Sequence, residues 1–293
     1  MNDKPDINEI INRISKQKLT DCSTVQQAET TLPNVEKAKE AIRLIKALFF
    51  PDFFCNNENI HEVSAINLTR LYLLMSEQIF RALCFSGAED CQKQTAAAMA
   101  TTFVGRLPEI KHLINTDVMA VCDFDPSVKS ANEVILCYPA VEAMLHYRTA
   151  HELLNLKIPM LPRMITELAH SATGIDIHPG ARIDEFFGID HGTGVVIGET
   201  CIIGKHVRLY QGVTLGARGF VFDDNGLPMN IPRHPIIEDN VTIYSNSTVL
   251  GRITIGHNSV IGGNVWLTSG VPPFSRIVQT KALASSFIDG SGI

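Results

Sequence analysis

The stretch that decides the fold is residues 195–216, VVIGETCIIGKHVRLYQGVTLG. Apolar residues return at every sixth position, at Val195, Cys201, Val207 and Val213, and a second apolar set follows two residues later. A fixed period of six is the sequence signature of a parallel β-helix. Small or branched side chains at the inward positions suit a narrow triangular prism. The stretch therefore predicts short strands stacked as a solenoid.

The six-residue period extends in both directions from this stretch. It runs back to Ile177 and, after a break at 219–234, resumes at Pro235 and continues to Val271. Glycine often follows the second apolar position, where a tight corner favours a residue that tolerates positive φ. We therefore predict a β-helix over 171–276, with an excursion loop at 219–234.

The start of the repeat departs from its own pattern. Counting by six places Pro179, Glu185 and His191 where an aliphatic residue is expected. A terminal coil is often atypical because it caps the core of a repeat protein. His191 is therefore either a residue of an irregular capping coil or a group with a chemical role.

The excursion GFVFDDNGLPMNIP at 219–232 is the second departure. Long loops inside a regular architecture are usually functional or disordered. Arg233 and His234 follow it directly. This pair can bind a carboxylate, for which arginine offers a two-pronged donor, or Arg233 can form an ordinary surface ion pair.

The first half of the chain has the period of helices. Apolar residues spaced by three and four, with Pro, Asn, Asp or Gly at the borders, predict helices at 34–49, 61–85, 88–104, 107–121, 138–156 and 161–171. We expect an α + β protein with three parts, which are an α-helical domain at 1–170, the β-helix domain at 171–276 and a flexible C-terminal tail at 277–293.

Composition excludes several classes of protein. The net charge is −6, and no Lys/Arg cluster offers the basic face that nucleic acid requires. The most apolar run, 68–85, contains Arg70, Glu77 and Arg81, which predicts a buried helix rather than a membrane span. The N-terminus lacks the apolar core of a signal peptide, so we expect a cytoplasmic protein. Seven cysteines without a C-x-x-C pair predict reduced thiols and no disulfide framework.

Several motifs, in order, resemble those of the bacterial serine O-acetyltransferases, a family of hexapeptide-repeat acyltransferases. They are DFDPS at 123–127, GIDIHPGARI at 174–183, GIDHGTGVVIGET at 188–200, VTLG at 213–216 and RHP at 233–235. The resemblance implies a left-handed β-helix. It also implies transfer of an acetyl group from acetyl-CoA to the hydroxyl of L-serine, which gives O-acetylserine for cysteine biosynthesis.

The resemblance also assigns roles to single residues. The catalytic pair is His191, as general base, and Asp176, as its carboxylate partner. The serine-binding residues are Asp125, Asp190, Arg233 and His234. The acetyl-CoA-binding residues are Gly216, Ala217, Ser245 and Gly263. Histidine is the usual base for a hydroxyl at neutral pH, and a carboxylate on its other nitrogen fixes the tautomer. Whether His234 binds the carboxylate or serves a second acid–base role stays open.

The chain ends FIDGSGI at 287–293, which is similar to the tail of the same family. That tail ends in isoleucine and docks into the active site of O-acetylserine sulfhydrylase, so the resemblance implies that Ile293 binds this partner. It further implies a trimer-based homo-oligomer, extended to a hexamer through the helical domains, and L-cysteine as a feedback inhibitor.

Three other functions compete with this interpretation. A related β-helix enzyme can acetylate a sugar or another small hydroxyl acceptor, and a non-catalytic scaffold can simply bind the sulfhydrylase. A γ-type carbonic anhydrase shares the fold and binds zinc through three histidines. Two of those histidines lie on one coil, and no such H-x4-H pair occurs among His178, His191, His206, His234 and His257, so we expect no metal site there.

Overall fold

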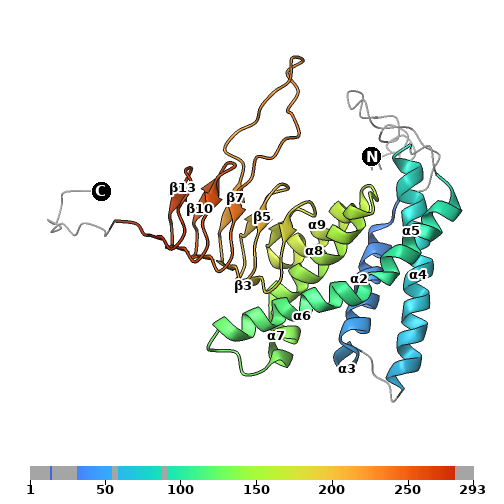
Figure 1. Cartoon of the computed structure of the whole chain (residues 1–293). Coiled ribbons are helices and arrows are strands. Elements are labelled where there is room, and N and C mark those ends of the chain that lie inside the picture. The colour runs from blue at the N-terminus through green and yellow to red at the C-terminus, as the bar shows by residue number, and fades with distance from the viewer. Residues whose placement is uncertain (1–13, 15–31, 55–58, 88–90, 281–293) are drawn as a thin grey trace, which may run out of the picture.

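The structure is a computed structural model that describes residues 14, 32–54, 59–87 and 91–280. A group of α-helices comes first in the chain and a parallel β-helix follows it (Figure 1). This order confirms the predicted fold class. Of the predicted tail at 277–293, residues 281–293, Ile293 included, lie outside the described residues. In the described part of the chain, no helix has the length and apolar character needed to cross a membrane.

The helices begin and end at residues that suit those positions. Asn34 caps the first of them by accepting hydrogen bonds from the N–H groups of Glu36 and Lys37, and Gly174 ends the last in the left-handed conformation. The helices are α2 (Val35–Phe49), α3 (Pro51–Phe54), α4 (Ile60–Phe85), α5 (Lys93–Gly105), α6 (Leu107–Phe124), α7 (Ala131–Cys137), α8 (Pro139–Asn155) and α9 (Leu161–Thr173).

The strands form three parallel sheets, one on each side of the prism, and from β1 to β13 every third strand belongs to the same sheet. Sheet A contains β1 (Asp176–Ile177), β4 (Val196–Ile197), β7 (Thr214–Gly216), β10 (Thr248–Leu250) and β13 (Trp266–Leu267). Sheet B contains β2 (Arg182–Ile183), β5 (Ile202–Ile203), β8 (Ile236–Ile237) and β11 (Thr254–Ile255). Sheet C contains β3 (Gly188–Asp190), β6 (Arg208–Tyr210), β9 (Thr242–Ile243), β12 (Val260–Ile261) and β14 (Arg276–Ile277).

The interior of the prism is filled by the two apolar sets that the sequence pattern predicts. Val195, Cys201 and Val207 are all buried, as are the aliphatic residues two positions after each. Where serine takes an inward position its hydroxyl is satisfied, because Ser247 donates to the Gly262 carbonyl oxygen at 2.6 Å. The period of six therefore reports the core correctly in the later coils.

The register that we predicted for the first coil is wrong. Its inward residues are Ile177, Ile183 and Ile189, which pair with Ile197, Ile203 and Leu209 of the next coil. The core therefore has no position at Pro179, Glu185 or His191, where the count by six had placed one. They lie outside the strands, between the elements that the apolar residues form.

Two inserted residues explain the error. Asp190 pairs with Tyr210, and Val196 pairs with Thr214. Val196 follows Asp190 by six positions, whereas Thr214 follows Tyr210 by only four. The first coil is thus longer at the corner between sheets C and A, and His191 lies in this longer corner.

A buried ion pair joins the helices to the β-helix. Arg148 on α8 pairs with Asp117 on α6, with 3.0 Å between guanidinium nitrogen and carboxylate oxygen. Arg148 also donates to the backbone carbonyl oxygens of Ile183 and Asp184, and Asp117 accepts from the N–H of Phe187. Burial raises the pKa of Asp117 to about 6, although the charge of Arg148 opposes the rise. These contacts fix the first coil against α6 and α8.

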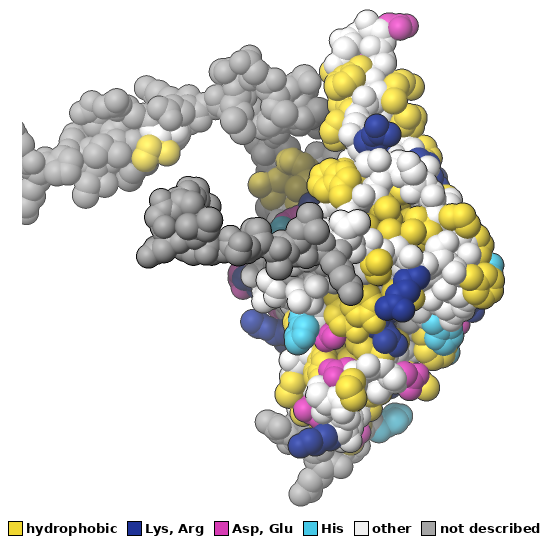
Figure 2. Space-filling view, turned by 90° about the vertical axis from the view of Figure 1, so that its left-hand side faces the viewer, with side chains coloured by type: hydrophobic (Ala, Val, Ile, Leu, Met, Phe, Trp, Pro, Cys, Tyr) yellow, Lys and Arg dark blue, Asp and Glu magenta, His cyan; other side chains and the backbone are white. Residues whose placement is uncertain are grey.

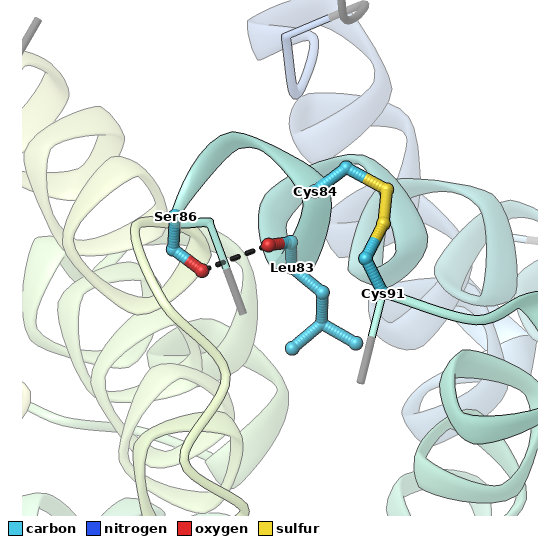
Figure 3. Close-up of a disulfide and its surroundings, with 4 residues drawn as sticks. All are labelled: Leu83, Cys84, Ser86 and Cys91. Carbon is cyan, nitrogen blue, oxygen red and sulfur yellow. Dashed lines mark hydrogen bonds between the residues drawn. A yellow bond between two sulfur atoms is a disulfide. The ribbon is translucent and has the colours of Figure 1, made fainter. Parts of the chain in front are cut away.

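One pair of cysteines contradicts the expectation of reduced thiols. Cys84, near the end of α4, and Cys91, just before α5, form a disulfide (Figure 3). The two helices pack against each other, so the end of α4 and the start of α5 lie close together, and with them the two sulfurs. The spacing of the two cysteines does not reveal the disulfide, because they lie seven positions apart and form no C-x-x-C pair. Cys22 and Cys55 lie outside the described residues, and the free thiols among the described ones are Cys122, Cys137 and Cys201.

The predicted excursion leaves the prism between β7 and β8 and rises well away from it (Figure 1). Its two arms run antiparallel, with a bridge between Phe222 and Pro228 and a hydrogen bond from the Met229 N–H to the Val221 carbonyl oxygen. Its apolar side chains, among them Phe220, are exposed. The excursion returns to sheet B directly after Arg233 and His234.

Candidate active site

His191 lies at the inserted corner between sheets C and A, with 75% of its side chain exposed. Its backbone is in the left-handed region, at φ +56°, as it is for Asn246 and Asn264 at the same corner of later coils. The His191 Nε2 is 3.9 Å from the Asp190 Oδ1. The imidazole is therefore accessible to a ligand and has a carboxylate beside it.

Asp125 faces the same corner from the end of α6. Its carboxylate accepts hydrogen bonds from the Ser127 hydroxyl at 2.7 Å and from the Tyr138 hydroxyl at 2.7 Å. These two bonds, together with the nearby charge of His191, hold the pKa of Asp125 below its ordinary value. Asp125, Asp190 and His191 thus form one cluster with two carboxylates.

The end of α6 is held against β3 by close packing. A Cβ added to Gly188 would lie 2.2 Å from the Phe124 Cε1, so glycine is required for this approach. The Arg208 guanidinium lies over the Phe124 ring, 4.1 Å from its centre. Phe124 is therefore fixed, and with it the position of Asp125, the next residue.

Arg233 and His234 lie at a different corner, between sheets A and B. The Arg233 guanidinium pairs with the Glu199 carboxylate at 2.6 Å and donates to the Asn230 side chain at 3.1 Å. Burial raises the pKa of Glu199, but the hydrogen bond from Arg233 and the charge of His178 outweigh it, and the pKa lies below its ordinary value. Sequence reasoning missed Glu199, although it stands in the GET of the motif at 188–200.

His234 is buried beside this arginine. Its Nδ1 accepts a hydrogen bond from the Thr200 N–H at 3.1 Å and lies 2.9 Å from the Thr200 hydroxyl. Burial, followed by the charge of Arg233, lowers the pKa of His234 to about 4. The ring is therefore neutral at physiological pH with its proton on Nε2, which leaves one N–H to donate. Sequence reasoning also missed Thr200, which orients this ring.

Asp176 belongs to a third group, on β1 and α9. It lies 3.8 Å from the Arg163 guanidinium, and its carboxylate, Glu167 and His170 have one ligating atom each within 4.8 Å of the others. Arg163 also pairs with Glu167 at 2.6 Å, which gives this group a cationic partner from the protein. The carboxylate beside His191 is Asp190, so the pairing of His191 with Asp176 stays a prediction.

The predicted acetyl-CoA residues divide between the same two corners. Ser245 and Gly263 stack at the His191 corner, where the Asn264 N–H donates to the Ser245 carbonyl oxygen at 2.9 Å. Gly216 and Ala217 lie at the other corner, where the chain leaves β7 for the excursion. On the face in Figure 2, Lys and Arg side chains are spread among hydrophobic, acidic and uncharged ones.

The candidate site therefore consists of two half-sites on opposite edges of sheet A. One holds Asp125, Asp190 and His191, and the other holds Arg233 and His234. In a small hydroxy amino acid the carboxylate is bonded directly to the α-carbon, and the hydroxyl is attached to it through one further carbon atom. Such a molecule is too short to touch both half-sites of one chain.

Comparison with known proteins agrees with the fold and points to one activity. A family model described as bacterial transferase hexapeptide (six repeats) matches residues 234–269. A plasmid-encoded serine acetyltransferase of Synechococcus elongatus is 44% identical over 275 residues, which cover 89% of this chain and 86% of that protein. The serine acetyltransferase of Bacillus subtilis is 44% identical over 166 residues, which cover 57% of this chain and 73% of that protein.

Solved structures of the same kind of enzyme resemble this one over nearly the whole chain. Serine acetyltransferase isoform 3 of Entamoeba histolytica, solved in complex with cysteine, superposes with a TM-score of 0.74 at 29% identity and covers 96% of this chain and 93% of its own. Serine acetyltransferase 1 of the same organism, solved with L-cysteine, superposes with a TM-score of 0.73 at 31% identity and covers 93% of this chain and 96% of its own.

Proposed function

Because this chain belongs to the serine acetyltransferase family, we propose that it transfers the acetyl group of acetyl-CoA to the hydroxyl of L-serine, with His191 as the general base. The observation that carries this proposal is the pair of half-sites. One offers a histidine with two carboxylates, and the other offers an arginine with a neutral histidine. Together they match the hydroxyl, ammonium and carboxylate groups of one amino acid.

The reaction needs no covalent intermediate on the protein. His191 takes the proton of the serine hydroxyl as the oxygen attacks the thioester carbonyl carbon. The tetrahedral intermediate then collapses, the carbon–sulfur bond breaks, and the CoA thiolate leaves and receives the proton from His191. General-base help of this kind is worth a factor of about 10² to 10⁴ in rate. Asp176 is the proposed partner that orients His191.

The charges of serine find partners in both half-sites. The carboxylates of Asp125 and Asp190 suit the ammonium group, and the guanidinium of Arg233 suits the carboxylate. His234 has a pKa lowered to about 4, which supports binding through a neutral N–H rather than a second acid–base role. Acetyl-CoA, the co-substrate, would lie against Ser245, Gly263, Gly216 and Ala217.

We infer that the complete site forms between two chains of a homo-oligomer. The separation of the half-sites on opposite edges of sheet A supports this arrangement, since a neighbouring prism can present its Arg233 edge to the His191 edge of this one. A closed ring of three chains satisfies every edge with one kind of contact. A hexamer built from two such rings through the helical domains is the full assembly that we propose.

The direct test of this function is release of free thiol from acetyl-CoA in the presence of different acceptors. We expect release with L-serine and much less with homoserine or sugars. The relatives solved with cysteine lead us to expect that L-cysteine inhibits in competition with serine. Release with a sugar and none with serine would replace this proposal with acetylation of another hydroxyl acceptor.

We also propose that Ile293 binds O-acetylserine sulfhydrylase, although this residue lies outside the described part of the chain. The support is the similarity of the final residues FIDGSGI to the tail of the family. Deletion of Ile293 should abolish binding to the sulfhydrylase in isothermal titration and leave acetyl transfer intact. Unchanged binding would remove the tail from this role, and loss of acetyl transfer with unchanged binding would show that the tail serves catalysis instead. A chain that binds the partner but never acetylates serine would be a scaffold.

A further inference from the structure

The His191 corner continues through the later coils as a column of three residues. Asp190, which precedes His191, pairs with Tyr210, so that Gln211 lies in the next coil at the same corner. The Asn246 N–H donates to the Gln211 carbonyl oxygen at 2.9 Å, which places Ser245 above Gln211, and Gly263 lies above Ser245. Neighbouring coils are about 4.8 Å apart. Gln211 is thus one coil from the His191 corner and one coil from Ser245.

The side chain of Gln211 carries a polar atom that has no hydrogen-bond partner among the described residues. This atom, its Oε1, is shielded from solvent. A buried acceptor without a donor costs free energy, and most buried polar atoms in proteins have a partner. Structural packing alone gives no reason for glutamine at this corner, because an apolar side chain of the same length would fill the space without that cost.

The residues above Gln211 in the column have little or no side chain. Ser245 and Gly263 are small, and a Cβ added to Gly263 would meet only Ser245, at 3.2 Å from its carbonyl oxygen. On the sheet C side, the rings of Tyr210 and Tyr244 stack at 4.7 Å and form a wall. The column therefore has small residues above Gln211, and the Gln211 carboxamide lies at the end nearest to His191.

We propose that the Gln211 carboxamide accepts a hydrogen bond from the pantetheine amide N–H nearest to the thioester of acetyl-CoA. This inference rests on the proposed function, which puts the reacting thioester at His191 and the rest of CoA against Ser245 and Gly263. In CoA, two carbon atoms separate the sulfur from that amide nitrogen, a length comparable to one coil. Gln211 then binds and orients the arm that delivers the acetyl group, and it takes no part in proton transfer.

The test measures the binding of CoA itself by isothermal titration, so that it does not depend on the acceptor. Gln211→Met keeps the length of the side chain and removes its hydrogen bonds. We expect the Kd for CoA to rise about three- to tenfold. The matched control is Gln94→Met, on the exposed surface of α5, which should leave the Kd unchanged. Circular dichroism and gel filtration confirm that both variants are folded and assembled.

A second substrate identifies the amide. S-acetyl-N-acetylcysteamine contains the thioester and only the nearest amide, so Gln211→Met should lower kcat/KM for it by the same factor as for acetyl-CoA. An unchanged Kd for CoA would overturn the inference. So would a fall in kcat of about 10² or more at unchanged Kd, because that is the effect of losing an oxyanion donor. A wild-type protein that does not bind CoA would instead refute the proposed function.

Discussion

At the scale of single residues, the site depends on what surrounds each functional side chain. His234 illustrates this, because its neutral state follows from burial and from the neighbouring charge of Arg233, and its orientation follows from Thr200. Its ring also lies directly against Gly198, where a Cβ would be 2.0 Å from the His234 Cδ2. Gly198 can therefore affect the proposed serine site only through the position of His234.

Gly198→Ala should displace His234 and weaken serine binding. We expect the KM for serine to rise about tenfold or more, because a hydrogen bond to a charged carboxylate is lost, while the KM for acetyl-CoA changes little. Steady-state kinetics with each substrate varied in turn measures both constants. Gly105→Ala is the control, since an added Cβ there meets nothing within 4 Å. A serine KM equal to that of the wild type would show that His234 does not contact the substrate.

Some residues of the candidate site could be predicted from the sequence, and others could not. His191, Asp190, Arg233 and His234 stand in contiguous motifs, so their types and order were readable. Glu199 and Thr200 were missed because their importance comes from contacts with residues more than thirty positions away. Periodicity could not reveal them, since it distinguishes inward from outward positions and gives no partner for an outward side chain.

At the scale of elements, the junction between the helices and the first coil holds the Asp125 half-site together. The ion pair of Arg148 and Asp117 is almost fully buried and is satisfied on several sides by the backbone of residues 183–187. α6 carries Asp117 in its middle and ends next to Asp125. The pair therefore fixes the helix whose end contributes to the site.

Arg148→Met should destabilise the protein by about 3–5 kcal/mol at pH 8, because it leaves a buried carboxylate without its partner. The pKa of Asp117 is already raised to about 6 by burial, and removal of the cation raises it further. The carboxyl group then takes up a proton as the pH falls, so the loss of stability should shrink between pH 8 and pH 5. Urea unfolding at both pH values measures this.

The control for this prediction is Arg70→Met. Arg70 pairs with Glu40 at the surface, where an ion pair contributes about 0–1 kcal/mol. A loss from Arg148→Met no larger than that of the control would contradict the role given to the buried pair. A loss that does not depend on pH would show that Asp117 is not the group left without a partner.

The six-residue period predicted the β-helix correctly and the register of its first coil wrongly. The period of six identified the β-helix, because each face of the prism takes six residues and inward side chains therefore recur at that interval. The same period gave the wrong register for the first coil. The two extra residues at the His191 corner move one apolar set onto the positions of the other, so the six-residue spacing continues without a visible gap. The inserted corner is visible only when strands are paired, as Asp190 with Tyr210 and Val196 with Thr214.

At the scale of the whole molecule, sheet A separates the two half-sites, and the proposed oligomer reunites them across a contact between chains. Each chain would then contribute its His191 edge to one site and its Arg233 edge to another. Such an arrangement makes activity depend on assembly, and it predicts that two different inactive chains can repair each other.

A mixture of His191→Ala and Arg233→Ala chains, unfolded and refolded together, should regain serine acetyltransferase activity that neither variant has alone. Some contacts in the mixture join an intact His191 edge to an intact Arg233 edge. The control mixture is His191→Ala with Asp125→Ala, which should stay inactive because both changes lie in the same half-site. Activity that remains absent in the first mixture would show that one chain supplies the whole site.

The central claim is that His191 removes the proton of the serine hydroxyl during transfer from acetyl-CoA. The most direct measurement is thiol release from acetyl-CoA with saturating L-serine, for the wild type and for His191→Asn, with CoA affinity determined for both. We expect kcat to fall by about 10² to 10⁴ and the Kd for CoA to stay unchanged. A His191→Asn variant with the kcat of the wild type would contradict it.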